Sequence, residues 1–476
     1  MQHLPINARY ESPLSTRYAS QEMSYLFSDS FRIITFRRLW IALATAQKKL
    51  GLPITSQQIE QMEQKIDTID PEAIQKYEKQ FRHDIMAHIH AFAELCPEAK
   101  PIIHLGATST YVTDNADLIQ IKEAMHLLHA KIISLLKKLS QLANQYANAP
   151  TLGFTHYQPA QPTTIGKRFC LWLQDFYHDA LDWERLSASL PFLGTKGATG
   201  TQASFLSLFE GDDKLVKELE TLISGMFGFS SVLPIASQTY SRKIDLSFLN
   251  ALASFAASAH KMATDLRLLA HEQECKESFG ESQIGSSAMP YKQNPIYAER
   301  ICGLSRFVLS LAQNPAYTAA TQWLERSLDD SSNRRLSIPE AFLATDAILN
   351  LLIHLLTHLE VNTELAYEHL LEKVPFLAME NLLMAVVKKG GDRQSAHETL
   401  RLLALQLVKE EDPHTFFLQE LTSQFNLSKQ EIAPYLDVQQ MIGRAPKQVT
   451  EFLHSSITPY LLKHQGKEAI FPEIEV

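Results

Sequence analysis

Glycine is scarce in this chain, which has 17 Gly among 476 residues. That is about half of the usual share of roughly 7%. Folds rich in β-turns need glycine, so its scarcity favours helices. The glycine-rich motifs GxxxxGK[ST] and GxGxxG are also absent. Nothing in the sequence therefore supports an ATP-binding phosphate loop or a dinucleotide-binding fold.

Cysteine is scarce too, and long apolar runs and an excess of positive charge are absent. The four cysteines are far apart and form no CxxC pair, which predicts reduced thiols in a cytoplasmic protein. Residues 1–13 hold no apolar signal-peptide core, and no apolar run reaches about 18 residues, so we expect no membrane span. The net charge of −9 argues against a general nucleic-acid partner.

Helical patterns fill most of the length, and 476 residues are long for one compact domain. Asp114 is a plausible cap for a helix of about 30 residues, and Ser241 to about Ser278 is the longest helix candidate. The apolar residues and alanines of that second helix are spread around its surface, which indicates burial on several sides. We predict an all-α protein with three parts: an N-terminal helical domain (1–110), a central long-helix bundle (111–364) and a C-terminal helical domain (365–476).

One polar loop interrupts the long helices, Gly285-Ser-Ser-Ala-Met-Pro-Tyr-Lys-Gln-Asn-Pro295. Its glycine and prolines are strong helix breakers. Its hydroxyls, amide and lysine could surround a carboxylate or a developing carbanion, which needs donors and a fixed positive charge in place. An ordinary flexible surface loop is the competing interpretation.

Four other stretches carry candidate chemistry, each with a plain alternative. His156 lies in a proline-bounded loop from Pro150 to Pro162 and is either a proton donor or a solvated turn residue. Hydroxyls at Thr108 and Ser109 precede a long helix and either hold an anion or simply cap the helix. A predicted helix from residue 71 towards residue 95 carries Arg82-His83-Asp84, and its histidines are either packing residues or, as the less favoured alternative, zinc ligands. The run from residue 326 to residue 335 is either an anion-binding surface or a solvated one.

The loop Gly285–Pro295, with Glu299 downstream, resembles the signature of the fumarase/aspartase superfamily. The stretches beginning at Arg82, His104, Gly153, Gly200 and Ser237 resemble the branch of that superfamily that acts on succinylated purine nucleotides, in its longer, animal-like form. The resemblance covers about residues 10–345. It implies a C–N lyase that eliminates fumarate in the anti sense from adenylosuccinate, giving AMP, and from SAICAR, giving AICAR.

The same resemblance implies an assembly and a set of site residues. The central domains would form a twenty-helix core in a homotetramer, with active sites shared between three subunits, and neither cofactor nor metal is required. The implied catalytic residues are Ser286 as the base, His156 as the acid, Glu299 to orient that acid, and Lys292 and His83. The substrate-binding positions are Arg17, Tyr18, Arg82, His83, Asp84, Thr108, Ser109, Gln238, Ser287, Met289, Asn294, Arg300, Arg326, Ser331 and Arg335, and the loop 282–296 is expected to be the catalytic loop.

Two alternatives stay open at this point. Another lyase of the superfamily, such as argininosuccinate lyase, would act on an amino-acid substrate, which does not need the phosphate-binding arginines at 17, 326 and 335. A catalytically silent helical scaffold would not need Ser286, His156, Lys292 and Glu299 together.

Overall fold

The computed structural model describes residues 10–278, 284–285, 287–425 and 427–469. The prediction of an all-α fold is confirmed, since helices make up almost all of the regular structure. The described strands form two small antiparallel pairs. They are β1 (Pro150–Thr155) with β2 (Gln158–Thr164), and β3 (Cys275–Lys276) with β4 (Glu360–Val361).

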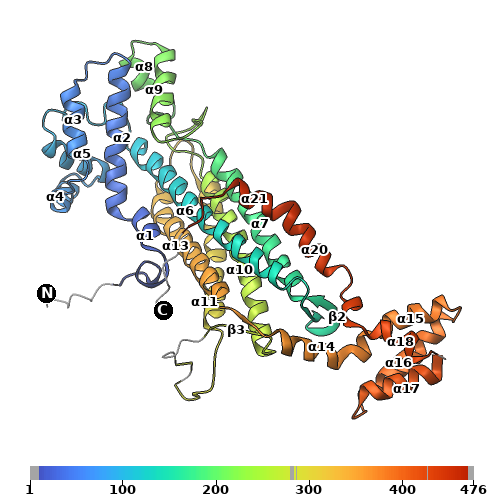
Figure 1. The fold of residues 1–476 in the computed structure, drawn as a ribbon. Helices are drawn as coiled ribbons and strands as arrows, with labels where there is room; N and C mark the ends of the chain where they lie inside the picture. The colour runs from blue at the N-terminus through green and yellow to red at the C-terminus, as the bar shows by residue number, and fades with distance from the viewer. Residues whose placement is uncertain (1–9, 279–283, 286, 426, 470–476) are drawn as a thin grey trace.

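Long helices lie side by side and form the central body of the molecule (Figure 1). Their apolar residues join into one large buried cluster. The most extensive packing in this body is that of α10 against α11 and of α6 against α7. The bundle consists of α6 (Ser109–Gln145), α7 (Ile165–Ser189), α10 (Lys243–His271), α11 (Ile296–Leu311) and α13 (Asp329–Thr357), with the short α12 (Gln313–Thr321) between the last two.

The predicted start of the first long helix was wrong. Helix α6 begins at Ser109 with Thr108 as its N-cap and has 37 residues, which makes it longer than the 29-residue α10. Asp114 lies within α6, buried against Arg242. An aspartate near a helix start is a local signal for capping, but here its charge compensates a buried arginine from a distant helix.

The proline-bounded stretch from Pro150 to Pro162 is a β-hairpin and not an irregular loop. Leu152 is paired with Pro162, and Phe154 with Pro159. Prolines are tolerated because every strand of a two-stranded sheet is an edge strand. The hairpin packs against α14 (Thr363–Leu377) at one end of the bundle (Figure 1).

Most of the N-terminal part packs at the opposite end of the bundle, while its first elements, η1 (Leu14–Tyr18) and α1 (Gln21–Leu26), pack along α13 (Figure 1). Asp70 caps α4 and Pro71 occupies its first turn, as predicted. The predicted continuation to residue 95 was wrong, because the chain turns at Arg82, whose φ of 53° is left-handed. The other elements are α2 (Asp29–Lys49), α3 (Ser56–Gln64), α4 (Pro71–Phe81) and α5 (Asp84–Leu95), with α8 (Ala203–Leu208) and α9 (Asp213–Met226) beside them.

The C-terminal part has two portions. The first has a hydrophobic cluster of its own, between residues 378 and 432. It contains α15 (Met379–Lys388), α16 (Arg393–Leu407), α17 (Pro413–Phe425), α18 (Lys429–Leu436) and α19 (Val438–Met441). The second portion runs back along α7 and α6 and consists of α20 (Ala445–Phe452), η2 (Leu453–Ile457) and α21 (Thr458–Lys463). The domain boundaries at 110 and 364 stay predictions.

Helix α13 is long and apolar enough to cross a membrane by length and composition. However, 78% of its most apolar window is buried inside the structure. That burial is what a core helix of the bundle requires, and α13 packs against both α11 and α6.

Candidate active site

The motif Arg82-His83-Asp84 occupies the junction between α4 and α5. Arg82 ends α4 in the left-handed conformation, and His83 is the N-cap of α5, where its Nδ1 accepts a hydrogen bond from the Met86 N–H at 3.3 Å. A non-glycine residue in this conformation costs about 1–3 kcal/mol and is most common at functional sites. Both side chains are exposed, so they are available to a ligand.

Asp84 connects this junction to two distant helices. Its carboxylate pairs with Arg32 of α2 and Arg335 of α13, each at 3.1 Å, and with His88 at 3.2 Å. The hydrogen bond with His88 and the charges of both arginines hold the pKa of Asp84 well below its usual range. The carboxylate therefore stays charged and orients Arg335. The two residues are far apart in the sequence, so only the fold brings them together.

The stretch from His104 to Ser109 lies close to that junction. His104 has a φ of 68°, and its Nδ1 accepts a hydrogen bond from the Trp40 Nε1–H at 2.9 Å. Thr108 is the N-cap of α6, yet its side chain makes no capping hydrogen bond. The hydroxyl of Thr108 therefore does not cap the helix, as the simpler interpretation would require. The helix N-terminus beside it is suited to binding an anion.

We expect His104 to make stability depend on pH. Burial, assisted by the charge of His83, lowers the pKa of His104 to about 4, whereas an unfolded histidine titrates near 6.5. Between these values the unfolded chain binds a proton that the native chain does not, so stability falls as the pH drops from about 6.5 to 4. Over this range, the urea midpoint of His104→Asn should fall less than that of the wild type.

Asparagine suits this test because it tolerates positive φ and can still accept the bond from Trp40. The matched control is His397→Asn, at an exposed position of α16. An equal pH dependence in His104→Asn and in the wild type would rule out the contribution of His104.

Buried charges hold α6, α10 and α13 together beside this region. Arg242 pairs with Asp114 at 2.9 Å and with Asp330 at 2.7 Å, and all three are buried. Asp330 also pairs with Arg326 at 2.7 Å. These pairs fix Arg326 beside the first turn of α13, which contains Asp330.

The next turn of α13 carries a second buried arginine. Arg334 is buried against Asp245 and Asp117, at 2.7 and 2.8 Å. Because Arg334 points inward, its neighbour Arg335 is left at the surface.

The remaining predicted binding residues of this end differ in their surroundings. The side-chain amide of Gln238 donates to the Ala198 carbonyl at 3.1 Å. Ser331 lies in the first turn of α13 and is partly exposed. Arg17 is exposed in η1, which packs against α13, and its guanidinium lies 5.8 Å from the centre of the Tyr18 ring.

His156 lies at the tip of the β1–β2 hairpin. Thr155 pairs with Gln158, so His156 and Tyr157 form a two-residue turn, and their φ values of 54° and 57° match a type I′ turn. The Tyr157 hydroxyl bonds to Glu272 at 2.9 Å, which ties the tip to the end of α10. The strained turn and this tether fix the backbone from which His156 projects.

The polar loop lies between β3 and α11. Ser286, the predicted base, is outside the described residues. The Asn294 side chain donates to the Gly285 carbonyl at 3.0 Å and closes the loop, while Lys292, Ser287 and Met289 are exposed. Tyr291, Gln293, Asn294 and Pro295 line an open groove together with residues in and near β3 and β4.

Glu277 anchors the far side of this loop, and no sequence motif pointed to it. Its two carboxylate oxygens accept the backbone N–H groups of Tyr297 and Ala298 at 2.9 and 2.8 Å. These bonds cap α11, whose first turns carry Glu299 and Arg300. Arg300 has one buried guanidinium nitrogen, Nη1, without a hydrogen-bond partner, whereas Glu299 is exposed.

Within one chain the structure brings together only some of the predicted residues. Asp84 contacts Arg335, and His83 lies close enough to His104 to affect its pKa. Among the described residues, no hydrogen bond links His156 to Glu299. The hairpin and the Arg82 junction lie at opposite ends of the bundle (Figure 1).

Known proteins resemble this chain over almost its whole length. A family model described as "Lyase" matches residues 9–309, and one described as "Adenylosuccinate lyase C-terminus" matches residues 375–452. An adenylosuccinate lyase of Schizosaccharomyces pombe is 47% identical over 460 residues, which cover 95% of each chain. That of Saccharomyces cerevisiae is 44% identical over 470 residues, or 97% of this chain and 98% of the yeast chain.

Two solved structures share the fold at low identity. The 3-carboxy-cis,cis-muconate lactonizing enzyme from Pseudomonas putida superposes with a TM-score of 0.83 at 22% identity, covering 94% of this chain and all of that one. A fumarate lyase from Mesorhizobium sp. BNC1 gives a TM-score of 0.81 at 23% identity, again over 94% of this chain and all of that one. These two likenesses concern the fold alone.

Proposed function

Because the chain belongs to the adenylosuccinate lyase family, we propose that it is a C–N lyase that splits adenylosuccinate into AMP and fumarate. The observation that carries this proposal is the 47% identity over 95% of both chains. The same activity extends to SAICAR, which gives AICAR and fumarate, and places the enzyme in purine nucleotide synthesis. We also propose that it acts in the cytoplasm.

The elimination needs a base, an acid and an anion-binding site. In our proposal Ser286 removes a proton from the succinyl Cβ, the C–N electron pair leaves with the nitrogen, and fumarate gains the new double bond. His156 supplies the proton that the departing nitrogen takes up. A base and an acid on opposite faces of the C–N bond give anti elimination.

Charge develops on the succinyl carboxylate as the Cβ proton leaves. We assign its stabilisation to Lys292 and Asn294, because cationic and amide donors that are in place before the reaction stabilise such a carbanion as it forms. Ser287 and Met289 contact the same group, and Glu299 orients His156. The closure of the loop by Asn294 and the capping of α11 by Glu277 support a fixed position for these donors.

The nucleotide is assigned to the other end of the bundle. The arginine fork suits phosphate, so we propose that Arg17, Arg326 and Arg335 bind the phosphate side together with Tyr18. The contact of Arg335 with Asp84 supports this grouping. The other proposed contacts at this end are Arg82, His83, Asp84, Thr108, Ser109, Gln238 and Ser331, and Arg300 is a further proposed contact beside the polar loop.

An active site assembled from these groups requires more than one chain. We propose a homotetramer in which three subunits contribute to each site, with twenty helices in its core. The wide separation of the hairpin from the Arg82 junction within one chain supports this proposal (Figure 1). Static light scattering should then give four times the chain mass of 53.8 kDa.

The direct test is fumarate release by purified full-length protein, followed by ultraviolet absorbance. We expect turnover of adenylosuccinate and of SAICAR and none of argininosuccinate, because the latter carries no phosphate for the arginines to bind. The Ser286→Ala variant should lose most turnover while keeping its fold. Turnover of argininosuccinate alone would support a different lyase of the superfamily, and no turnover by well-folded protein would support a silent scaffold.

A further inference from the structure

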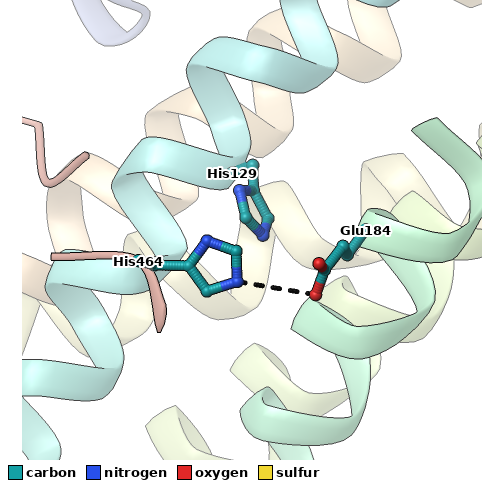
Figure 2. Close-up of side chains that lie close together, drawn as sticks. All are labelled: His129, Glu184 and His464. Carbon is teal, nitrogen blue, oxygen red and sulfur yellow. Dashed lines mark ion pairs between the residues drawn. The ribbon is translucent and has the colours of Figure 1, made fainter. Parts of the chain in front are cut away.

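A cluster of two histidines and one glutamate lies where the C-terminal segment returns to the bundle. His464 follows α21 directly and meets His129 of α6 and Glu184 of α7 (Figure 2). One potential ligand atom from each side chain lies within 4.8 Å of the other two. It is the one group of this kind among the described residues, and none of its members belongs to the proposed active site.

His464 has an unusual environment for a buried polar side chain. It is 3% exposed, and neither of its ring nitrogens has a hydrogen-bond partner. A carboxylate oxygen of Glu184 lies 3.5 Å from its Nε2 (Figure 2). Buried polar groups normally have hydrogen-bond partners, so a buried imidazole with only this long contact to Glu184 indicates a missing partner.

The surroundings of the three side chains shift their pKa values. Burial and the neighbouring His464 lower the pKa of His129 to about 4, and burial lowers the pKa of His464. The hydrogen bond from Lys463 lowers the pKa of Glu184. Neutral imidazole and ionised carboxylate are the forms in which these groups bind metal ions.

We propose that His129, Glu184 and His464 bind a divalent transition-metal ion, for which zinc is the best match, and that this ion fastens the C-terminal segment to α6 and α7. Two imidazoles and a carboxylate are a recurrent zinc ligand set, with water in the fourth position. Zinc bonds of about 2.0–2.2 Å require the ligand atoms to draw together from their present spacing.

Two neighbours compete with the metal. The Tyr460 hydroxyl lies 2.9 Å from His129 Nε2 and must turn away if that nitrogen binds the ion. Lys463 is bonded to one carboxylate oxygen of Glu184, which leaves the oxygen that faces His464 for the metal. Tyr460 and Lys463 belong to the same C-terminal segment, so they can adjust together with His464.

The test is zinc binding to the full-length protein after chelator treatment and dialysis. By titration calorimetry we expect one zinc ion per chain, and the thermal midpoint should rise with zinc because the ion binds the folded chain. Magnesium, which prefers oxygen ligands, should leave the midpoint unchanged. His464→Gln should weaken zinc binding by at least about 100-fold, since even the loss of a group behind a ligand costs about 10–100-fold.

The matched control is His358→Gln, which removes an exposed histidine and should keep the zinc affinity of the wild type. Glu184→Gln provides a second test if His464→Gln does not fold, because it keeps the side-chain shape and removes the ligand charge. Fumarate release should be unaffected by Glu184→Gln without zinc. The proposal would be overturned if zinc did not bind stoichiometrically. It would also be overturned if His358→Gln lost as much zinc affinity as the cluster variants.

Discussion

Replacing His156 with alanine is expected to lower kcat for adenylosuccinate by about 10²–10⁴-fold, the usual contribution of one proton-transfer group. The departing nitrogen would then have to take its proton from water. Because the proposed role lies in the chemical step, KM should change far less than kcat. Steady-state rates of fumarate release measure both constants.

The fold should survive this change, because His156 lies at an exposed hairpin tip. His397→Ala, at an exposed position of α16, is the matched control and should keep the wild-type rate. Turnover of His156→Ala close to that of the wild type would exclude His156 as the acid.

The shared-site proposal adds a second outcome for the same variant. Mixed tetramers of His156→Ala with His83→Ala should be more active than either variant alone, because some sites would draw both intact residues from different subunits. If all residues of a site came from one chain, mixing would restore nothing.

Replacing Arg242 with methionine is expected to lower the free energy of unfolding by about 3–5 kcal/mol, the usual cost of breaking a buried pair. Arg242 has a side chain that is 1% exposed, and its removal leaves the carboxylates of Asp114 and Asp330 buried with less compensation. Urea denaturation followed by circular dichroism measures the change.

Two further variants separate this effect from a general loss of an arginine. Arg401→Met removes an exposed arginine paired with Glu398 and should leave the midpoint nearly unchanged, because surface pairs contribute little. The double variant Arg242→Met/Asp114→Asn should be less destabilised than the sum of the single changes, since it removes one uncompensated charge. Strict additivity would mean that Arg242 and Asp114 do not interact.

Local patterns were enough to predict some elements and not others. Asp70 followed by Pro71 correctly predicted the start of α4, because capping depends on adjacent residues. The break at Arg82 had no such signal, since no glycine marks the left-handed residue. The hairpin was also missed, because two-stranded sheets accept prolines that usually indicate a loop.

The sequence by itself determined the helical class and the family, because helix periodicity and the motifs from Arg82 to Pro295 are contiguous properties of the chain. Only the tertiary structure placed Asp84 beside Arg335, Trp40 beside His104 and Glu277 at the start of α11. It alone also brought His129, Glu184 and His464 into one cluster. These contacts join helices that are far apart in sequence, and packing of whole apolar faces, not any local residue pattern, decides which helices meet.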